Sequence, residues 1–311
     1  MVSDNRKIDP LYAAVHALGD SWSWLIMRDV LFHDVNRFNH LQRRLGISRE
    51  TLSARLERLV DNNVLARHDA ASGQAVLYLP TQIGEDLFAS IAVATRWGQE
   101  WCAPADASLI SMIHETCGHE FLPEFRCRAC AEPIDPRAVK ATSDATTRSV
   151  IAGDRTRLVT GKNQLLDQFD PLAEALSIIA DRWTSLIIRE CFFGARRFDT
   201  FTSTLGIATN TLTKRLKHLV DNDVLNRTEY QQQPTRHEYR LTNKGLAVYP
   251  IPLALLTWGR KWFSANTAPI ELIHRTCNNE LEATLTCGAC NRAADRAATI
   301  SESTKLTSRQ E

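Results

Sequence analysis

The 311-residue sequence lacks any apolar run close to the roughly 20 residues that a membrane-spanning helix needs. Its opening segment, MVSDNRKIDP, contains no apolar core of the kind found in a secretory signal peptide. A glycine-rich phosphate-binding loop and a nucleophile–base set are also missing. These absences disfavour a membrane protein, a secreted protein and an enzyme, and we expect a cytoplasmic protein that makes no membrane contact.

An excess of one charge is missing too, since 37 Lys and Arg residues stand against 36 Asp and Glu. A formal net charge of +1 indicates no global attraction to nucleic acid, so any such partner must be argued from local charge. Eight cysteines in a chain without an export signal favour a reducing compartment. Metal ligation, catalysis or burial are then commoner fates for these thiols than structural disulfides.

The sequence does contain one module written twice. The segment LSARLERLVDN at 52–62 returns as LTKRLKHLVDN at 212–222, and DSWSWLIMRD at 20–29 returns as DRWTSLIIRE at 181–190. TRWGQEW and HETC of the first half return as LTWGRKW and HRTC in the second. A length of 311 residues allows about two domains with separate cores. The sequence therefore predicts a tandem duplication with a polar linker between the copies.

Within each copy, apolar residues recur at helical spacing and are followed by two short strand-like runs. Ser48 is the expected N-cap of a helix whose buried stripe is Leu52, Leu56 and Leu59. Asn63 follows that helix where a left-handed residue is favoured. Helix, turn, amphipathic helix and β-hairpin, in that order, describe a winged helix-turn-helix. The second helix of such a unit enters the major groove of double-stranded DNA.

The segments DRWTSLIIRE, RRFDTFTSTLGIATNTLTKRLKHLVDNDVL and PTRHEYRLTNKG resemble the HxlR-type family of bacterial transcription regulators. The second copy matches this pattern across 172–262. The first matches through residue 68, and its wing lacks the family's Pro and Arg at the tip. The resemblance implies DNA binding as a dimer, so a covalent tandem would be a built-in dimer. Redox-sensing members carry a Cys just before the first helix, where this chain has Asp9 and Asp170, which disfavours thiol sensing there.

Local charge supports DNA binding in both copies. Between Arg37 and Arg58 there are six Arg against two acidic residues, and between Arg196 and Lys217 five bases against one acidic residue. Each helix-turn-helix segment therefore has a formal net charge of +4, although the whole chain is nearly neutral. Phosphate contact requires such a concentration of positive charge, although a solvated basic helix face is the simpler alternative.

Positions on the second helix divide into candidate roles. Those on its exposed N-terminal half are expected to reach base edges, namely Arg49, Glu50, Ser53 and Ala54 in the first copy and Thr209, Asn210, Thr213 and Lys214 in the second. Arg55 and Arg215 are the same in both copies, which suits phosphate positioning; a salt bridge to Asp61 or Asp29 is an equally weighted alternative. Arg236 and His237 make the second wing more basic than the first.

Both copies also contain the spacing H-x2-C-x9-C-x2-C. The residues are His114, Cys117, Cys127 and Cys130 in the first copy, and His274, Cys277, Cys287 and Cys290 in the second. Three thiolates and one imidazole form a closed tetrahedral zinc set, so the spacing predicts two structural zinc ions per chain. Redox chemistry and inert packing are the alternatives. Cys102 and Cys191 have no Cys counterpart in the other copy and are expected to be packing residues.

We therefore expect a mainly α protein with small β wings, that is, two tandem winged helix-turn-helix domains, each followed by a zinc-ribbon-like module. The expected boundaries are 1–103 for the first domain, 104–140 for its ribbon, 141–166 for the linker, 167–265 for the second domain, 266–298 for its ribbon and 299–311 for a polar tail. The expected function is a sequence-specific DNA-binding transcription regulator that can also pair as a homodimer, and the sequence does not reveal whether it has a small-molecule effector. A protein-interaction adaptor is the rival interpretation, because fold alone does not fix function.

Overall fold

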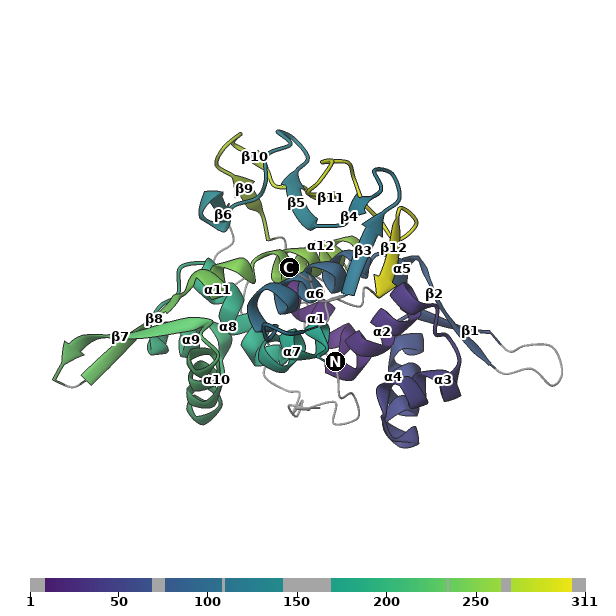
Figure 1. Cartoon of the computed structure of the whole chain (residues 1–311). Coiled ribbons are helices and arrows are strands. Elements are labelled where there is room, and N and C mark those ends of the chain that lie inside the picture. Colours follow the sequence, from purple (N-terminus) through teal and green to yellow (C-terminus); the bar gives the residue numbers. More distant parts are fainter. Residues whose placement is uncertain are drawn as a thin grey trace, which may run out of the picture. The chain divides into compact units, whose positions relative to one another are not determined.

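The computed structural model describes residues 9–68, 76–107, 110–141, 169–233, 235–263 and 270–303 (Figure 1). The described chain divides into two compact units. One, here called the α4 unit, holds the described parts of residues 17–125, 169–177 and 284–303. The other, the α10 unit, holds those of residues 9–16, 126–141 and 178–283. Each unit therefore contains segments from both copies of the repeat.

Both copies form the same order of helices. Those of the first are α1 (Pro10–Leu18), α2 (Ser21–His33), α3 (Phe38–Leu45), α4 (Arg49–Asp61), α5 (Gln82–Glu85) and α6 (Phe88–Cys102). Their counterparts are α7 (Pro171–Ile179), α8 (Arg182–Phe192), α9 (Phe198–Leu205), α10 (Thr209–Asp221), α11 (Asn243–Ala247) and α12 (Pro250–Phe263). The wings are the antiparallel pairs β1 (Leu65–His68) with β2 (Leu77–Pro80), and β7 (Leu225–Gln232) with β8 (Thr235–Leu241). The predicted helix, turn, helix and hairpin are present in both copies.

The second helix of the first helix-turn-helix, α4, begins where the sequence predicts. The Ser48 hydroxyl accepts a hydrogen bond from the Thr51 backbone N–H at 3.2 Å and caps the helix. Leu52, Leu56 and Leu59 are at most 1% exposed, so the predicted stripe is the face that α4 buries. The opposite face of α4 is thereby left to solvent.

Left-handed residues end these helices in both copies. Asn63 and Asp223 have φ angles of 56° and 57°, as the sequence predicts for residue types that tolerate this conformation. Gly46 and Gly206, with φ near 60°, end α3 and α9 in the same way. The turn between the two helices therefore has the same geometry in both copies.

The first helix of each copy packs in the unit that holds the rest of the other copy. Most of α1 belongs to the α10 unit, and most of α7 belongs to the α4 unit. The crossings occur at glycines: a Cβ added at Gly98 would lie 1.9 Å from the Pro171 carbonyl oxygen, and one at Gly259 would lie 2.2 Å from that of Pro10. The Trp-Gly pair repeated in the sequence therefore marks the place where a helix from the other copy crosses.

Two buried arginines hold these exchanged segments. Each pairs with a carboxylate on its own helix and with one just before the exchanged helix: Arg189 with Glu190 and Asp9, and Arg28 with Asp29 and Asp170. Asp9 and Asp170, the residues just before α1 and α7, are thus partners of buried arginines.

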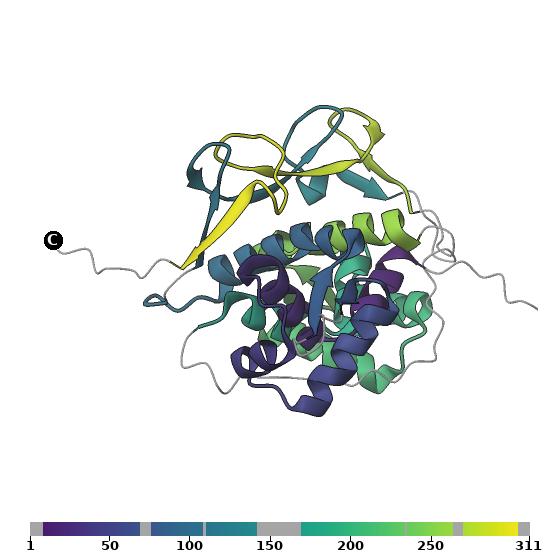
Figure 2. The same cartoon turned by 90° about the vertical axis from the view of Figure 1, so that its right-hand side faces the viewer.

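Strands are exchanged as well. In the α4 unit, β12 (Thr299–Ser303) pairs with β3 (Ile110–His114), which also pairs with β4 (His119–Glu120) (Figure 2). In the α10 unit, β6 (Val139–Ala141) pairs with β9 (Leu272–His274), which also pairs with β10 (Asn279–Glu280). A further pair joins β5 (Pro123–Cys127) to β11 (Ala283–Cys287), and a short 3-10 helix, η1, spans Pro136–Ala138. The start of the predicted polar tail is therefore a strand.

Most of the predicted linker at 141–166 lies outside the described residues, as does the tail beyond residue 303. Among the helices that the structure describes, none has the length and apolar character needed to span a bilayer.

Candidate nucleic-acid interface and metal centres

The N-terminal half of α4 presents the side chains that the sequence assigns to base contact. Arg49, Glu50 and Ala54 are exposed, and Ser53 is half-buried. The guanidinium of Arg49 lies 5.2 Å from the centroid of the Phe38 ring, a cation–π contact that restrains it at the start of the helix. The exposed positions follow from the buried leucine stripe on the other face.

The matching face of α10 has different chemistry on the same backbone. Thr209, Asn210, Thr213 and Lys214 are all exposed. The Thr213 hydroxyl donates to the Thr209 carbonyl at 2.9 Å, whereas the N-cap residue, Ala208, supplies no side-chain cap. The two helices thus offer different donor and acceptor sets from equivalent positions.

Arg55 and Arg215 each form a salt bridge, but with partners other than the two considered from the sequence. Arg55 donates to the Asp20 carboxylate at 2.6 and 2.8 Å, and Arg215 pairs with Asp181 at 2.6 Å. Asp20 and Asp181 also cap α2 and α8. These aspartates precede equivalent helices in the repeated segments, and that signal could have identified them as caps. Arg55 therefore ties α4 to α2, and Arg215 ties α10 to α8.

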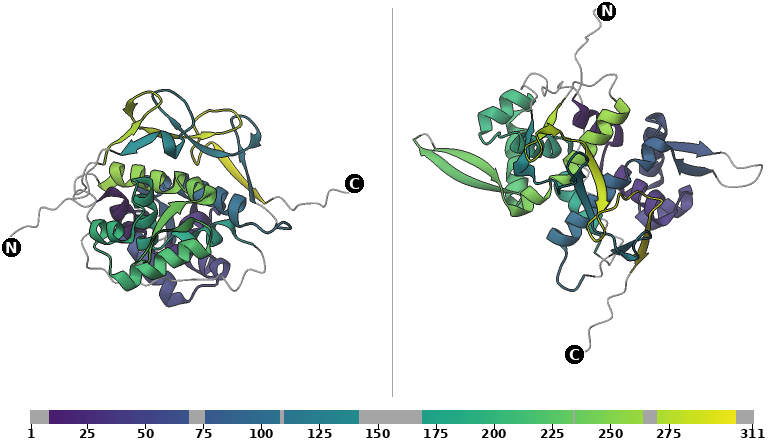
Figure 3. Two further views of the ribbon diagram at one scale, coloured as in Figure 1. Left: turned by 90° about the vertical axis from the view of Figure 1, so that its left-hand side faces the viewer. Right: turned by 90° about the horizontal axis from the view of Figure 1, so that it is seen from above.

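The second wing projects from the helices of its own unit as a two-stranded ribbon (Figure 3). Arg236 on this wing is exposed, and His237 is half-buried with its Nδ1 3.1 Å from Arg227. Tyr230, which no pattern in the sequence marks, is 38% exposed, and the Arg197 guanidinium lies 4.6 Å from the centroid of its ring. Residues 69–75 at the tip of the first wing lie outside the described residues.

The eight ligand candidates gather into two clusters, and each draws on both copies. One contains His114, Cys117, Cys287 and Cys290 in the α4 unit; the other contains Cys127, Cys130, His274 and Cys277 in the α10 unit. The expected grouping of all four ligands from a single copy is therefore wrong, although each cluster keeps one His and three Cys. The exchange follows from β5 pairing with β11, which carries each Cys-x2-Cys pair away from the His-x2-Cys pair of its own copy.

The spacing within the clusters fits a tetrahedral ion. His114 Nδ1 lies 3.3 Å from Cys117 Sγ and 3.4 Å from Cys290 Sγ, and Cys127 Sγ lies 3.9 Å from Cys277 Sγ. Bonds of about 2.3 Å to sulfur and 2.0–2.1 Å to nitrogen place tetrahedral ligand atoms roughly 3.6–3.8 Å apart. The ligand atoms thus stand close to the separations that zinc imposes.

Each pair of ligands is followed by a left-handed residue. Gly118, Ala131, Asn278 and Asn291 come directly after the second ligand of their pairs and have φ between 57° and 68°. The Gly that the second knuckle often uses is replaced by Ala131 and Asn291, but the conformation is kept. Because a non-glycine residue in this region costs about 1–2 kcal/mol, the surrounding knuckle must hold it there.

Backbone N–H groups also point at the sulfurs. Those of His119, Glu132, Asn279 and Ala289 donate toward Cys117, Cys130, Cys277 and Cys287 respectively. The hydrogen bond from Asn279, together with that from His274, lowers the pKa of Cys277 to about 6. The pKa of Cys287 is lowered as well, whereas desolvation and the neighbouring thiols raise the pKa of Cys117 and Cys130. In each cluster, therefore, at least one sulfur has its thiolate favoured, and the thiolate is the form that binds metal.

The remaining thiols lie outside these clusters. Cys102 and Cys191 form no disulfide and are half-buried, and burial raises the pKa of the Cys191 thiol well above its usual range. A thiol held protonated is a poor nucleophile, which agrees with the packing role predicted from the sequence.

Two copies of a helix-turn-helix with an exposed second helix and a following hairpin define a winged-helix DNA-binding protein. Residues 17–106 and 178–267 each match the HxlR-like helix-turn-helix family, and together they make up more than half of the chain. The chain therefore belongs to that family as a tandem duplication. The family's members are transcriptional regulators and not enzymes, and membership implies DNA as a partner.

Three relatives illustrate the likeness. An uncharacterized HTH-type transcriptional regulator of Mycobacterium tuberculosis is 38% identical over 122 residues, which is 39% of this chain and 77% of the relative. One from Synechocystis is 32% identical over 104 residues, or 33% of this chain and 77% of the relative. The HTH-type transcriptional regulator YodB of Bacillus subtilis is 32% identical over 88 residues, which is 28% of this chain and 79% of the relative. Each relative therefore matches a stretch close to one copy in length.

Proposed function

We propose that the chain is a sequence-specific transcription regulator that reads two different half-sites with α4 and α10. This proposal rests on a comparison of α4 with α10. Exposed residues at equivalent positions of the two helices differ, whereas the buried residues and the arginine that fix the helices are the same. Arg49 corresponds to Thr209, Glu50 to Asn210 and Ala54 to Lys214, whereas the leucine stripe and Arg55 recur unchanged. A single chain with two such helices acts as a covalent pseudo-dimer on an asymmetric operator.

The chemistry of these side chains suggests what each helix reads. Arg49 suits guanine, Glu50 can accept from cytosine, Asn210 suits adenine and Lys214 suits guanine. Each good side-chain–base pair discriminates by about 1–3 kcal/mol, so a few differences suffice to separate the half-sites. Ser53 and Thr213 add hydroxyls on the same faces. Arg236 on the second wing is proposed to contact the backbone beside its half-site.

Arg55 and Arg215 are proposed to support affinity without sequence information. Each pairs with the aspartate that caps α2 or α8, and part of each side chain remains exposed, 26% for Arg55 and 13% for Arg215. A role in orientation and a phosphate contact are therefore compatible. Replacement by Ala should weaken all duplexes about equally and lower the salt slope by about one unit.

Salt-dependent binding to duplex DNA tests the DNA-reading proposal. Binding should weaken steeply with salt, because counterion release supplies most non-specific affinity. Lys214→Ala should weaken binding, whereas Lys140→Ala, which removes an exposed lysine from a strand of the same unit, should leave it unchanged. If no duplex binds, or if the two variants behave alike, the adaptor interpretation replaces this one.

We also propose that each cluster of one His and three Cys binds a structural zinc ion. The tetrahedral spacing, the left-handed residue after each ligand pair and the N–H···S hydrogen bonds all support this assignment. The strands that carry the ligands are two to five residues long, and a bound zinc ion would stabilise their arrangement. Elemental analysis of protein purified without chelator should give two zinc ions per chain. Metal-free protein with reactive thiols would exclude the assignment.

A further inference from the structure

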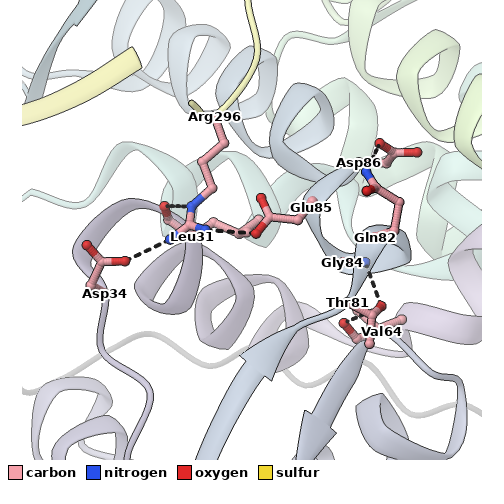
Figure 4. A network of polar contacts seen from close by, with 9 residues as sticks. All are labelled: Leu31, Asp34, Val64, Thr81, Gln82, Gly84, Glu85, Asp86 and Arg296. Atoms are coloured by element: carbon pink, nitrogen blue, oxygen red, sulfur yellow. Dashed lines mark hydrogen bonds and ion pairs between the residues drawn. The ribbon is translucent and has the colours of Figure 1, made fainter. Parts of the chain in front are cut away.

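The Arg296 side chain ties the metal-ligating segment of the α4 unit to its helix-turn-helix. Its Nε donates to the Leu31 carbonyl at 2.8 Å, and its terminal nitrogens pair with Glu85 at 2.8 Å and Asp34 at 2.7 Å (Figure 4). Arg296 follows the ligand Cys290 on the same loop. Since the Asp34 side chain is 85% exposed, that ion pair is screened by solvent, and the part-buried contact with Leu31 near the end of α2 is the more important.

A row of aromatic rings provides a second connection between the same parts. The ring of the ligand His114 lies 6.0 Å from that of Phe121, which lies 6.1 Å from Phe88 on α6. Phe88 stacks in turn on Phe32 near the end of α2, at 5.0 Å between ring centroids. His114, Phe88 and Phe121 are at most 4% exposed, so a shift of the ligand ring meets closely packed neighbours.

The helix α2 joins these contacts to the reading helix. Leu31 and Phe32 lie in its last turn, and Asp20 at its N-terminus holds Arg55 of α4. Thirteen helical residues make a rod about 20 Å long, which can carry a displacement from one end to the other. A displacement of the C-terminal end of α2, which contacts the metal-ligating segment, therefore also displaces α4.

At the positions that match Arg296, Phe121 and Glu85, the described part of the α10 unit has other residue types, and there an exposed ion pair between Arg260 and Glu280 joins α12 to β10. In the aligned repeats, Pro136 stands at the position of Arg296, Leu281 at that of Phe121 and Leu246 at that of Glu85. None of these three can form the guanidinium–carboxylate pair or continue the row of rings. The two metal clusters thus have similar ligands but different connections to the helices of their units.

We propose that the ion held by His114, Cys117, Cys287 and Cys290 is an effector of DNA binding by α4, whereas the ion of the other cluster serves only to hold its strands. This inference rests on the proposed zinc binding and DNA reading. Occupancy of the α4-unit site fixes the end of α2 and so favours the DNA-binding position of α4. By linkage, DNA bound at α4 must tighten metal binding at this site by the same factor.

The duplication supplies matched variants for the test. Cys290→Ser removes a ligand from the α4-unit site, and Cys130→Ser removes its counterpart from the α10-unit site. Binding is measured on full-length protein with a duplex whose affinity depends on Arg49, and zinc content is measured alongside. We expect each variant to retain one zinc, with Cys290→Ser weakening binding at least about fivefold and Cys130→Ser less than about twofold. Equal effects of the two variants would overturn the inference.

A second variant separates coupling from misfolding. Arg296→Ala keeps all ligands, so it should retain two zinc ions and still weaken binding to the Arg49-dependent duplex. Adding Cys290→Ser to Arg296→Ala should then cost less than Cys290→Ser alone, because the two residues act along one path. Independent, additive losses would contradict this. In unmutated protein, the same duplex should protect one of the two zinc ions from a chelator, and protection of neither would also overturn the inference.

Different results would refute the zinc assignment, the DNA-reading proposal and the coupling between them. Absence of zinc from the unmutated protein refutes the metal assignment, and absence of duplex binding refutes the DNA-reading proposal. Either result also overturns the coupling. Two zinc ions and salt-dependent binding, with no difference between Cys290→Ser and Cys130→Ser, refute the coupling alone.

Discussion

The guanidinium of Arg189 donates a hydrogen bond to the carboxylate of Asp9, a residue 180 positions earlier in the chain, and both side chains are buried. Asp9 also accepts from the Tyr12 backbone N–H and caps the exchanged helix α1. Arg28 and Asp170 repeat the arrangement in the other unit. An aspartate just before α1 and another just before α7 thus hold the two exchanged helices in place.

Replacing Asp9 with Asn should destabilise the protein through loss of this ion pair. Asn caps helices as well as Asp does, so the change isolates the charge. Because Glu190 still pairs with Arg189, we expect a loss of about 1.5–3 kcal/mol, seen as a lower urea midpoint. Lys217→Ala, which removes an exposed pair with Asp221, should cost less than about 0.5 kcal/mol. Equal shifts in the two variants would contradict the role of Asp9.

Gly98→Ala and Gly259→Ala should both destabilise the protein. Gly to Ala inside a helix ordinarily stabilises by up to about 1 kcal/mol, but here the added Cβ would overlap a proline carbonyl of the exchanged helix. We expect a net loss of about 1–3 kcal/mol from the forced separation of the helices, measured by thermal unfolding. The ordinary stabilisation at either site would show that the crossing is not as close as the structure places it.

Pairs of ligand substitutions distinguish the exchanged clusters from clusters formed within one copy. Cys117→Ser with Cys290→Ser removes two ligands from one cluster, so one zinc should remain. Cys117→Ser with Cys127→Ser damages both clusters, so zinc should be lost from both. Grouping by copy requires the opposite results, because Cys117 and Cys127 would then share an ion. Elemental analysis of the two double variants decides between them.

The sequence was sufficient to predict what depends on local patterns. The Ser48 cap, the leucine stripe of α4 and the left-handed Asn63 each follow from residue type and spacing, and all are present. The sequence also predicted sets of one His and three Cys, and the structure gathers these residues into two such sets. It could not show that each cluster combines a His-x2-Cys pair of one copy with a Cys-x2-Cys pair of the other. That grouping depends on the pairing of β5 with β11, which joins segments more than 150 residues apart. Asp20 as the partner of Arg55 depended likewise on how α2 packs on α4.

Acid should weaken the fold partly through His33. Burial, followed by the nearby charge of Arg44, lowers the pKa of His33 to about 4, and Arg28, Asp29 and Asp170 also act on it. The folded state therefore binds this proton less readily than the unfolded state, whose His pKa is about 6.5. The stabilising contribution is complete above about pH 6.5 and is lost as the pH falls toward 4.

The matched variant is His33→Gln, which cannot take up the proton. Its free energy of unfolding should fall less steeply than that of the unmutated protein between pH 6.5 and 4. The difference between the two curves isolates His33 from the carboxylates that titrate in the same range. Parallel curves would show that His33 titrates alike in the folded and unfolded states.

Selection of bound sequences from a random duplex library tests whether α4 and α10 read different half-sites. Two reading helices with different side chains on matching scaffolds predict an asymmetric site, with half-sites about 10 base pairs apart centre to centre. Exchanging residues 49–54 for 209–214 should make the two half-sites alike. A perfect short palindrome as the preferred site, or a preference unchanged by that exchange, would contradict the account.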